Sequence, residues 1–153
     1  MKILMLTPYL PYPPSSGGQV RSFNLIKQLS KKHQITLCSL IKYDNEKKYI
    51  DKLEQFCQRV YVFKRAEKPW TWQSILTTGI SRFPFLVIRN FSPIEKKAVR
   101  EILEKQRFDI IHAETFYVSP HIPQTEIPIV LVDQMIEYQV YQHFVQNFRL
   151  KIL

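Results

Sequence analysis

The sequence predicts an α/β fold in which a mainly parallel sheet is doubly wound, with helices on both faces. Short apolar runs recur along the 153 residues, and segments with helical periodicity separate them. The runs lack polar alternation, which is typical of strands that helices cover on both faces. Strands that alternate with helices favour parallel pairing through right-handed crossovers. We expect the strands near residues 2–7, 34–41, 60–64, 109–113 and 128–132.

The first thirty residues predict a strand, a loop and a helix. The loop is rich in proline and ends at Gly17 and Gly18, after which apolar residues recur on one side of a helical pattern. The free N–H groups at the start of such a helix suit an anion. Alternatively, the two glycines only form a tight turn. The sequence contains neither a P-loop nor the Gly-x-Gly-x-x-Gly dinucleotide fingerprint.

The remaining helices follow from capping residues and periodicity. Asp44 is expected to cap a helix that runs through Cys57. Ser92 is expected to cap another helix, with Pro93 in its first turn and Glu95 at its third position. A short helix is expected within residues 115–125. The last helix presents an apolar face without a capping glycine, and that face comprises Tyr141, Phe144, Val145, Phe148 and Ile152.

Residues 64–91 form a basic segment that also contains tryptophan and phenylalanine. Five basic residues against one glutamate give it a net charge of +4. Such a segment favours docking on an anionic membrane surface, to which basic residues and interfacial aromatic side chains both contribute. Alternatively, the aromatic side chains pack inside the domain or bind a substrate.

Composition indicates one domain over residues 1–153 and limits its partners. The chain has 22 basic and 13 acidic residues, a net charge of +9, which favours phosphate-bearing or other anionic partners. The absence of a nucleic-acid-binding motif argues against nucleic acid. Two cysteines without C-x-x-C spacing, together with the lack of a signal peptide, predict a cytoplasmic protein. No spacing of histidine, cysteine and carboxylate residues indicates a metal site.

Candidate site residues lie where parallel strands are expected to end. Ligands of open α/β sheets bind beyond the carboxyl ends of the strands, so the loops at 7–18, 114–117 and 133–138 should share one rim. Glu114 follows the fourth strand and is the better polar candidate, whereas His112 is expected to be a core histidine. The third loop carries Asp133, Gln134 and Glu137, which either line the rim or cap and complement the next helix.

Three segments carry a resemblance to a known family. They are residues 1–14 with Gly17, Gly18 and Arg21, residues 108–114 (Phe-Asp-Ile-Ile-His-Ala-Glu), and residues 132–138 (Val-Asp-Gln-Met-Ile-Glu-Tyr). Together they resemble the N-terminal half of family 4 glycosyltransferases. The resemblance implies a GT-B architecture, in which two Rossmann-like halves face each other across a cleft. This chain would be the acceptor-side half, and a C-terminal half with a Glu-x₇-Glu signature, absent here, would hold the nucleotide-sugar donor.

The resemblance also implies a function and site residues. The parent enzyme would be a retaining glycosyltransferase that moves a sugar to a glycan or lipid-linked acceptor without an obligatory metal or cofactor. Glu114 would be the catalytic residue, and the substrate-binding residues would be Gly17, Gly18, Arg21, Asp133, Gln134 and Glu137. This chain alone is expected to be inactive and to self-associate through its C-terminal apolar face. An alternative function is a stand-alone Rossmann-like module that binds a nucleotide or phosphorylated metabolite.

Overall fold

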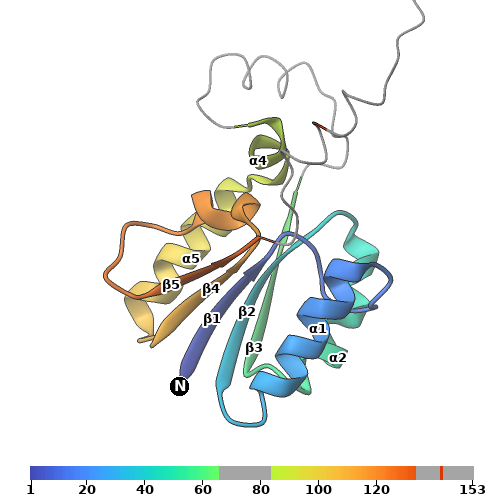
Figure 1. Cartoon of the computed structure of the whole chain (residues 1–153), viewed down its shortest axis with the longest axis horizontal. Coiled ribbons are helices and arrows are strands. Elements are labelled where there is room, and N and C mark those ends of the chain that lie inside the picture. Colours follow the sequence, from blue (N-terminus) through green and yellow to red (C-terminus); the bar gives the residue numbers. More distant parts are fainter. Residues whose placement is uncertain (66–83, 134–141, 143–153) are drawn as a thin grey trace, which may run out of the picture.

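The computed structural model describes residues 1–65, 84–133 and 142. They contain one parallel β-sheet with helices packed against it (Figure 1). Five strands pair in the order β3-β2-β1-β4-β5, and every pairing is parallel. They are β1 (Lys2–Thr7), β2 (Gln34–Ile41), β3 (Arg59–Lys64), β4 (Ile110–Glu114) and β5 (Ile129–Val132). The predicted strands and their parallel pairing are confirmed.

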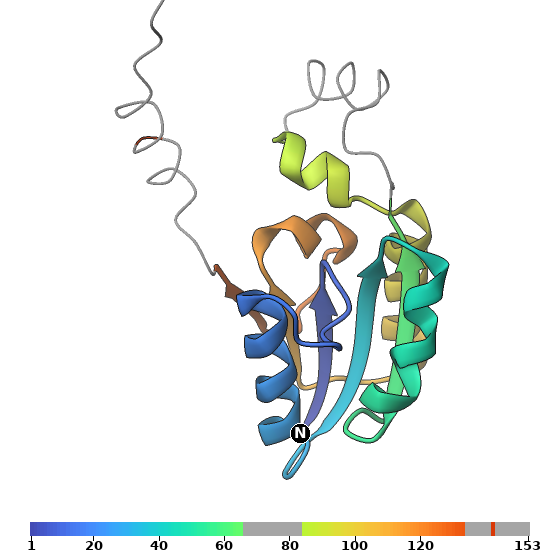
Figure 2. The ribbon, with the colours of Figure 1, turned by 90° about the vertical axis from the view of Figure 1, so that its right-hand side faces the viewer.

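Helices cover both faces of the sheet, so the doubly wound fold is also confirmed. Helices α1 (Gly17–Leu29) and α2 (Ile50–Glu54) lie on one face, and α5 (Pro93–Lys105) lies on the other (Figures 1 and 2). A 3₁₀ helix, η2 (Phe116–His121), follows β4 on the α5 side, where the sequence predicts a short helix. The short helix α4 (Phe85–Asn90) packs on η2.

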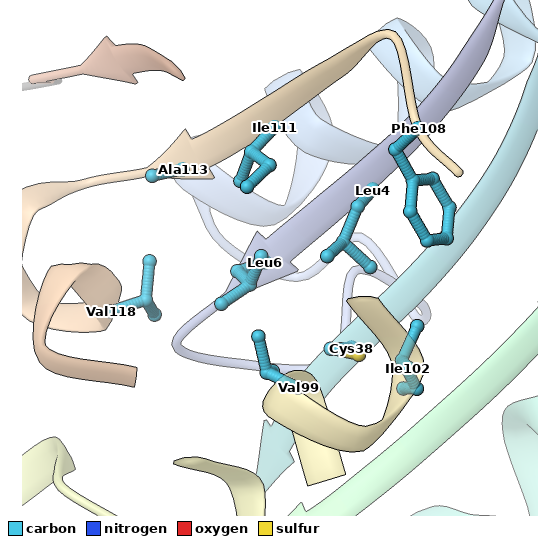
Figure 3. Close-up of a cluster of buried hydrophobic side chains, with 9 residues drawn as sticks. All are labelled: Leu4, Leu6, Cys38, Val99, Ile102, Phe108, Ile111, Ala113 and Val118. Atoms are coloured by element: carbon cyan, nitrogen blue, oxygen red, sulfur yellow. The ribbon is translucent and has the colours of Figure 1, made fainter. Parts of the chain in front are cut away.

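The core consists of two apolar layers separated by the sheet. Successive residues of β1 alternate between them, because side chains of a strand point to opposite faces. Leu4 and Leu6 pack under α5, as Figure 3 shows. Met5 packs with Ile26 under α1. The predicted all-apolar strand pattern is therefore satisfied in β1 and β2, where both faces are buried.

The helix predicted after Asp44 differs from the one observed. Asp44 does not cap it: residues Asp44–Tyr49 form a 3₁₀ helix, η1, and the Asp44 carboxylate instead contacts Nζ of Lys47 and Lys64 at 2.8 and 3.0 Å. The α-helical part ends at Glu54, so Cys57 lies beyond it. The N–H groups of residues 56 and 57 both bond to the carbonyl of Leu53, which closes the helix with a turn.

The predicted start of α5 is confirmed for all three residues, with Glu95 at the third position of the helix. Ser92 is the N-cap and its Oγ accepts a hydrogen bond from the N–H of Glu95, while Pro93 begins the helix. Glu95 does not return a bond to Ser92 as a capping box requires. The Ser92 N–H donates instead to Nε2 of His121 at 2.9 Å, because η2 packs against this end of α5.

Several predictions fall outside the described residues. They concern the central part of the basic aromatic segment (66–83), the site residues Gln134 and Glu137, and the C-terminal apolar face, which the sequence places within 141–152. Among the described residues, no helix is both long enough and apolar enough to cross a membrane.

Candidate functional site

An ion pair between Arg21 and Glu114 lies at the carboxyl edge of the sheet. Glu114 is the last residue of β4, and Arg21 lies in the second turn of α1. Strand β4 pairs with β1 so that His112 lies opposite Met5, whose side chain faces α1. Side chains two residues apart in a strand share a face, so Glu114 also points towards α1. There its Oε1 meets Nη1 of Arg21.

Glu114 also contacts His112 of its own strand. The His112 Nε2 lies 2.8 Å from Oε2 of Glu114, so both carboxylate oxygens have a partner. The Glu114 side chain is fully buried, whereas the Arg21 side chain is 44% exposed. A buried carboxylate requires such partners, because its desolvation is costly. The buried Glu114 carboxylate therefore holds Arg21, whose partly exposed guanidinium presents its charge at the surface.

The residue after Glu114 has an unusual backbone conformation. Thr115 has φ 74° and ψ 155°, a region that non-glycine residues rarely adopt. Its N–H bonds to the carbonyl of Val132 at 2.8 Å, and its buried Oγ1 has no hydrogen-bond partner among the described residues. Backbone strain and unpaired buried polar atoms are both typical of functional sites. The sequence gives no signal of this conformation, since a glycine would normally mark it.

The N-terminus of α1 lies about one turn before Arg21 in the same helix. Ser16 is the N-cap and accepts a hydrogen bond from the N–H of Gln19. The Gln19 side chain donates to the carbonyl of Leu10 at 2.9 Å, which fastens the proline-rich loop to the helix. Gly17 and Gly18 begin α1 rather than forming a separate turn, and no described glycine has a positive φ. Space beside Gly17 is open, because a Cβ placed there would meet nothing within 4 Å.

The sheet therefore brings four of the predicted site residues to one edge: Gly17, Gly18, Arg21 and Glu114. Asp133 follows β5, the next strand, and is exposed. Sequence reasoning overlooked the contact that His112 makes with Glu114. It also overlooked a buried hydrogen bond from Thr7 Oγ1 to Ser39 Oγ at 2.9 Å, which links the ends of β1 and β2.

A second polar cluster fixes η2 to the start of α5. His121 is fully buried, and its Nδ1 lies 3.0 Å from the carbonyl of Val118 while its Nε2 accepts from the N–H of Ser92. This arrangement requires a neutral ring, and burial lowers the pKa of His121 to about 4. The buried Glu95 carboxyl lies 3.4 Å from Nε2, and burial raises the pKa of Glu95 to about 8. Both groups are therefore neutral near pH 7.

The two cysteines are buried in the two core layers. Burial raises the pKa of the Cys38 thiol well above its ordinary value and raises that of Cys57 to about 12. Neither thiol is thus ionised at neutral pH, as a nucleophile or metal ligand would need to be. Within the described ranges, no group of three or more histidine, cysteine, aspartate or glutamate residues is placed to hold a metal ion.

Comparison with known proteins supports the fold and gives no information on the function. No protein-family model and no curated protein matches the chain. Among solved structures, the chain is similar to the C-terminal domain of a hydrogenase from Pyrococcus furiosus, with a TM-score of 0.55 and 17% sequence identity. The match covers 85% of this chain and 89% of that domain. At this level of identity, the similarity shows a shared Rossmann-like α/β arrangement.

Proposed function

We propose that this chain is the N-terminal, acceptor-side domain of a retaining glycosyltransferase that moves a sugar from a nucleotide-sugar to a glycan or lipid-linked acceptor. The observation that carries the proposal is the exposed Arg21 guanidinium, held by the buried Glu114 beside the N-terminus of α1. The three sequence segments that resemble family 4 glycosyltransferases support it. Their first two segments contribute Arg21 and Glu114 to this edge of the sheet.

The arrangement fits the charges of such a reaction. The bond between the anomeric carbon and the diphosphate breaks, the acceptor oxygen bonds to that carbon, and the proton of the acceptor hydroxyl passes to the departing diphosphate oxygen. Negative charge develops on the leaving diphosphate. Arg21 and the N–H groups that begin α1 form a positive region in which such charge is favourable. Glu114 and His112 keep Arg21 in place, so the site is preorganised before a substrate arrives.

Titration of the ¹⁵N-labelled chain, followed by NMR, tests the proposal. The ligands are a panel of oligosaccharide and polyprenyl-diphosphate acceptors, and we expect an acceptor to shift resonances around Arg21 and Thr115. Arg21→Gln should weaken the binding of a diphosphate-bearing acceptor roughly tenfold, as expected for a charge-assisted contact to an anionic group. Arg100→Gln is the matched control, because Arg100 is an exposed arginine of α5 on the opposite face. No acceptor binding, or equal losses in both variants, would contradict the proposal.

A stand-alone binding module for a nucleotide or phosphorylated metabolite is the second candidate. The open space beside Gly17, at the start of a capped helix, favours it. The two candidates differ in what the isolated chain binds. A plain nucleotide that binds at the start of α1 as tightly as its nucleotide-sugar, with no acceptor bound, would support the module. Acceptor binding with weak nucleotide binding would support the glycosyltransferase domain.

A further inference from the structure

A hollow lies at the amino edge of the sheet, opposite the candidate site. Its volume is about 470 Å³, and it is lined by Met1, Lys2, Lys32, Gln34, Arg107 and Asp109. Figure 2 shows the N-terminus at the edge of the sheet from which β1 starts, away from the strand ends that carry Glu114. The volume falls within the range of roughly 300–1,000 Å³ that small-molecule sites occupy.

Three cations from separate parts of the chain line this hollow. Lys2 begins β1, Lys32 lies between α1 and β2, and Arg107 lies between α5 and β4. Within the part of the chain that the structure describes, none of the three forms an ion pair. This distinguishes them from Lys47 and Lys97, which pair with carboxylates of their own helices. The hollow therefore contains positive charge that the protein itself leaves uncompensated.

Asp109, the one carboxylate of the hollow, is engaged by the backbone. Its Oδ2 accepts a hydrogen bond from the N–H of Lys2 at 2.6 Å, and its own N–H donates to the carbonyl of Lys2 at 2.9 Å. Three cations and one carboxylate leave a charge of +2 among the lining side chains. Lys32 and Arg107 follow α1 and α5, where a positive charge interacts favourably with the negative C-terminal end of the helix. That explanation does not apply to Lys2, because Lys2 begins a strand.

We propose that this hollow is a binding site for a small ligand that carries a diphosphate group. Cations on three separate segments match two adjacent anionic centres better than one. Arg107 supplies the planar fork that holds phosphate oxygens in pairs, and the two lysines act as point charges. Gln34 adds an amide to the lining. The proposal is independent of the glycosyltransferase function, because it rests on other residues at the other edge of the sheet.

Titration with inorganic pyrophosphate, followed by ¹⁵N NMR at 0.15 M salt, tests the site. We expect saturable shifts centred on Lys2, Gln34 and Asp109. The double variant K32Q/R107Q should weaken binding roughly tenfold, since each exposed charge contact is worth up to about fivefold. The matched control K52Q/R100Q removes the same charge from exposed positions on α2 and α5 and should leave the affinity unchanged.

Two further measurements make the result decisive. Asp109→Asn should tighten binding about threefold or more, because the amide oxygen still accepts from Lys2 while the repelling charge is gone. A nucleoside diphosphate should bind at the same place with similar affinity, and inorganic phosphate more weakly. Binding that disappears at 0.15 M salt, equal losses in both double variants, or shifts spread over the whole surface would overturn the proposal. Arg21→Gln should have no effect on this binding, which separates the site from the one at the opposite edge.

Discussion

Glu114 is the residue whose surroundings most constrain the candidate site, because its charge is buried and needs partners. Arg21→Gln would remove one charged partner of Glu114, while His112 remains. We expect a loss of roughly 1–3 kcal/mol in the free energy of unfolding, the usual cost of an unsatisfied buried acceptor. Because Arg21 is partly exposed, we expect a smaller loss in the free energy of unfolding than for a fully buried ion pair. Urea unfolding of the two proteins measures the difference.

The control is the double variant R21Q/E114Q. If Arg21 stabilises the fold by pairing with Glu114, neutralising both should restore part of the loss, with a coupling energy of roughly 0.5–3 kcal/mol. Strictly additive effects of the two substitutions would show that the ion pair does not carry the stability.

Glu95 and His121 make the stability of the fold depend on pH in a definite direction. Burial raises the pKa of Glu95 from 4.5 to about 8, so between these values the folded state binds more protons, and stability falls as pH rises. Burial lowers the pKa of His121 from 6.5 to about 4, so stability rises with pH up to 6.5 and offsets Glu95 there. Of these two groups, only Glu95 changes the stability between pH 6.5 and 8. We expect its contribution to fall by up to about 1.4 kcal/mol per pH unit and to level off above pH 8.

Glu95→Gln isolates this effect, because glutamine keeps the size of the side chain without its titration. Urea unfolding at intervals from pH 6.5 to 8.5 should give a decline for the native protein and a nearly flat profile for the variant. Parallel profiles for the two proteins would show that Glu95 does not titrate with a raised pKa.

Helix α1 begins beside Arg21, at the edge of the sheet that carries the candidate site. Gly17 has no positive φ and open space where a Cβ would stand, so alanine fits without strain. Gly17→Ala should therefore raise the free energy of unfolding by about 0.5 kcal/mol, mainly by restricting the unfolded chain. Urea unfolding measures it, and a destabilised variant would contradict the geometry of this turn. If the glycine is retained for ligand access, the same substitution should weaken the binding of anionic ligands near Arg21.

Strands were predictable here because apolar runs of the right length have few alternatives in a chain of this size. The five strands agree with the runs that predicted them. In β1 and β2 the reason is that burial on both faces of a parallel sheet imposes a simple apolar pattern. The helix after Asp44 was less predictable. Its capping residue could bond either to the backbone or to lysine, and the nearby Lys64 of β3 is distant in sequence.

The site shows the same limit. Strand ends indicated Glu114, because position along a strand is local information. Its pairing with Arg21 joins residues 93 positions apart and depends on how α1 lies across the sheet. The backbone conformation of Thr115 depends on its hydrogen bond to β5 and not on the residue type. No sequence pattern therefore indicates it. Tertiary contacts decided each of these features.

Strand β5 lies at the outer side of the sheet and is poorly covered by the described residues. The side chains of Ile129, Val130 and Leu131 in β5 are each 41–53% exposed, although the strand is as apolar as the buried β1 and β2. Neighbours in a strand point to opposite faces, so β5 exposes apolar surface on both. An apolar edge strand without charges is prone to pair with another chain.

We therefore expect the purified chain to self-associate as its concentration rises, and the charged variant I129K/L131K to reduce this. Lysines at an edge oppose pairing because association would bury or juxtapose their charges. The two positions lie on one face of the strand, and both are about half exposed, so the substitutions should preserve the fold. Val20→Lys is the control, since Val20 is an exposed apolar residue of α1. Sedimentation velocity at several concentrations measures the mass. A monomer at every concentration would contradict the expectation, and association that only Val20→Lys abolishes would move the contact from β5 to α1.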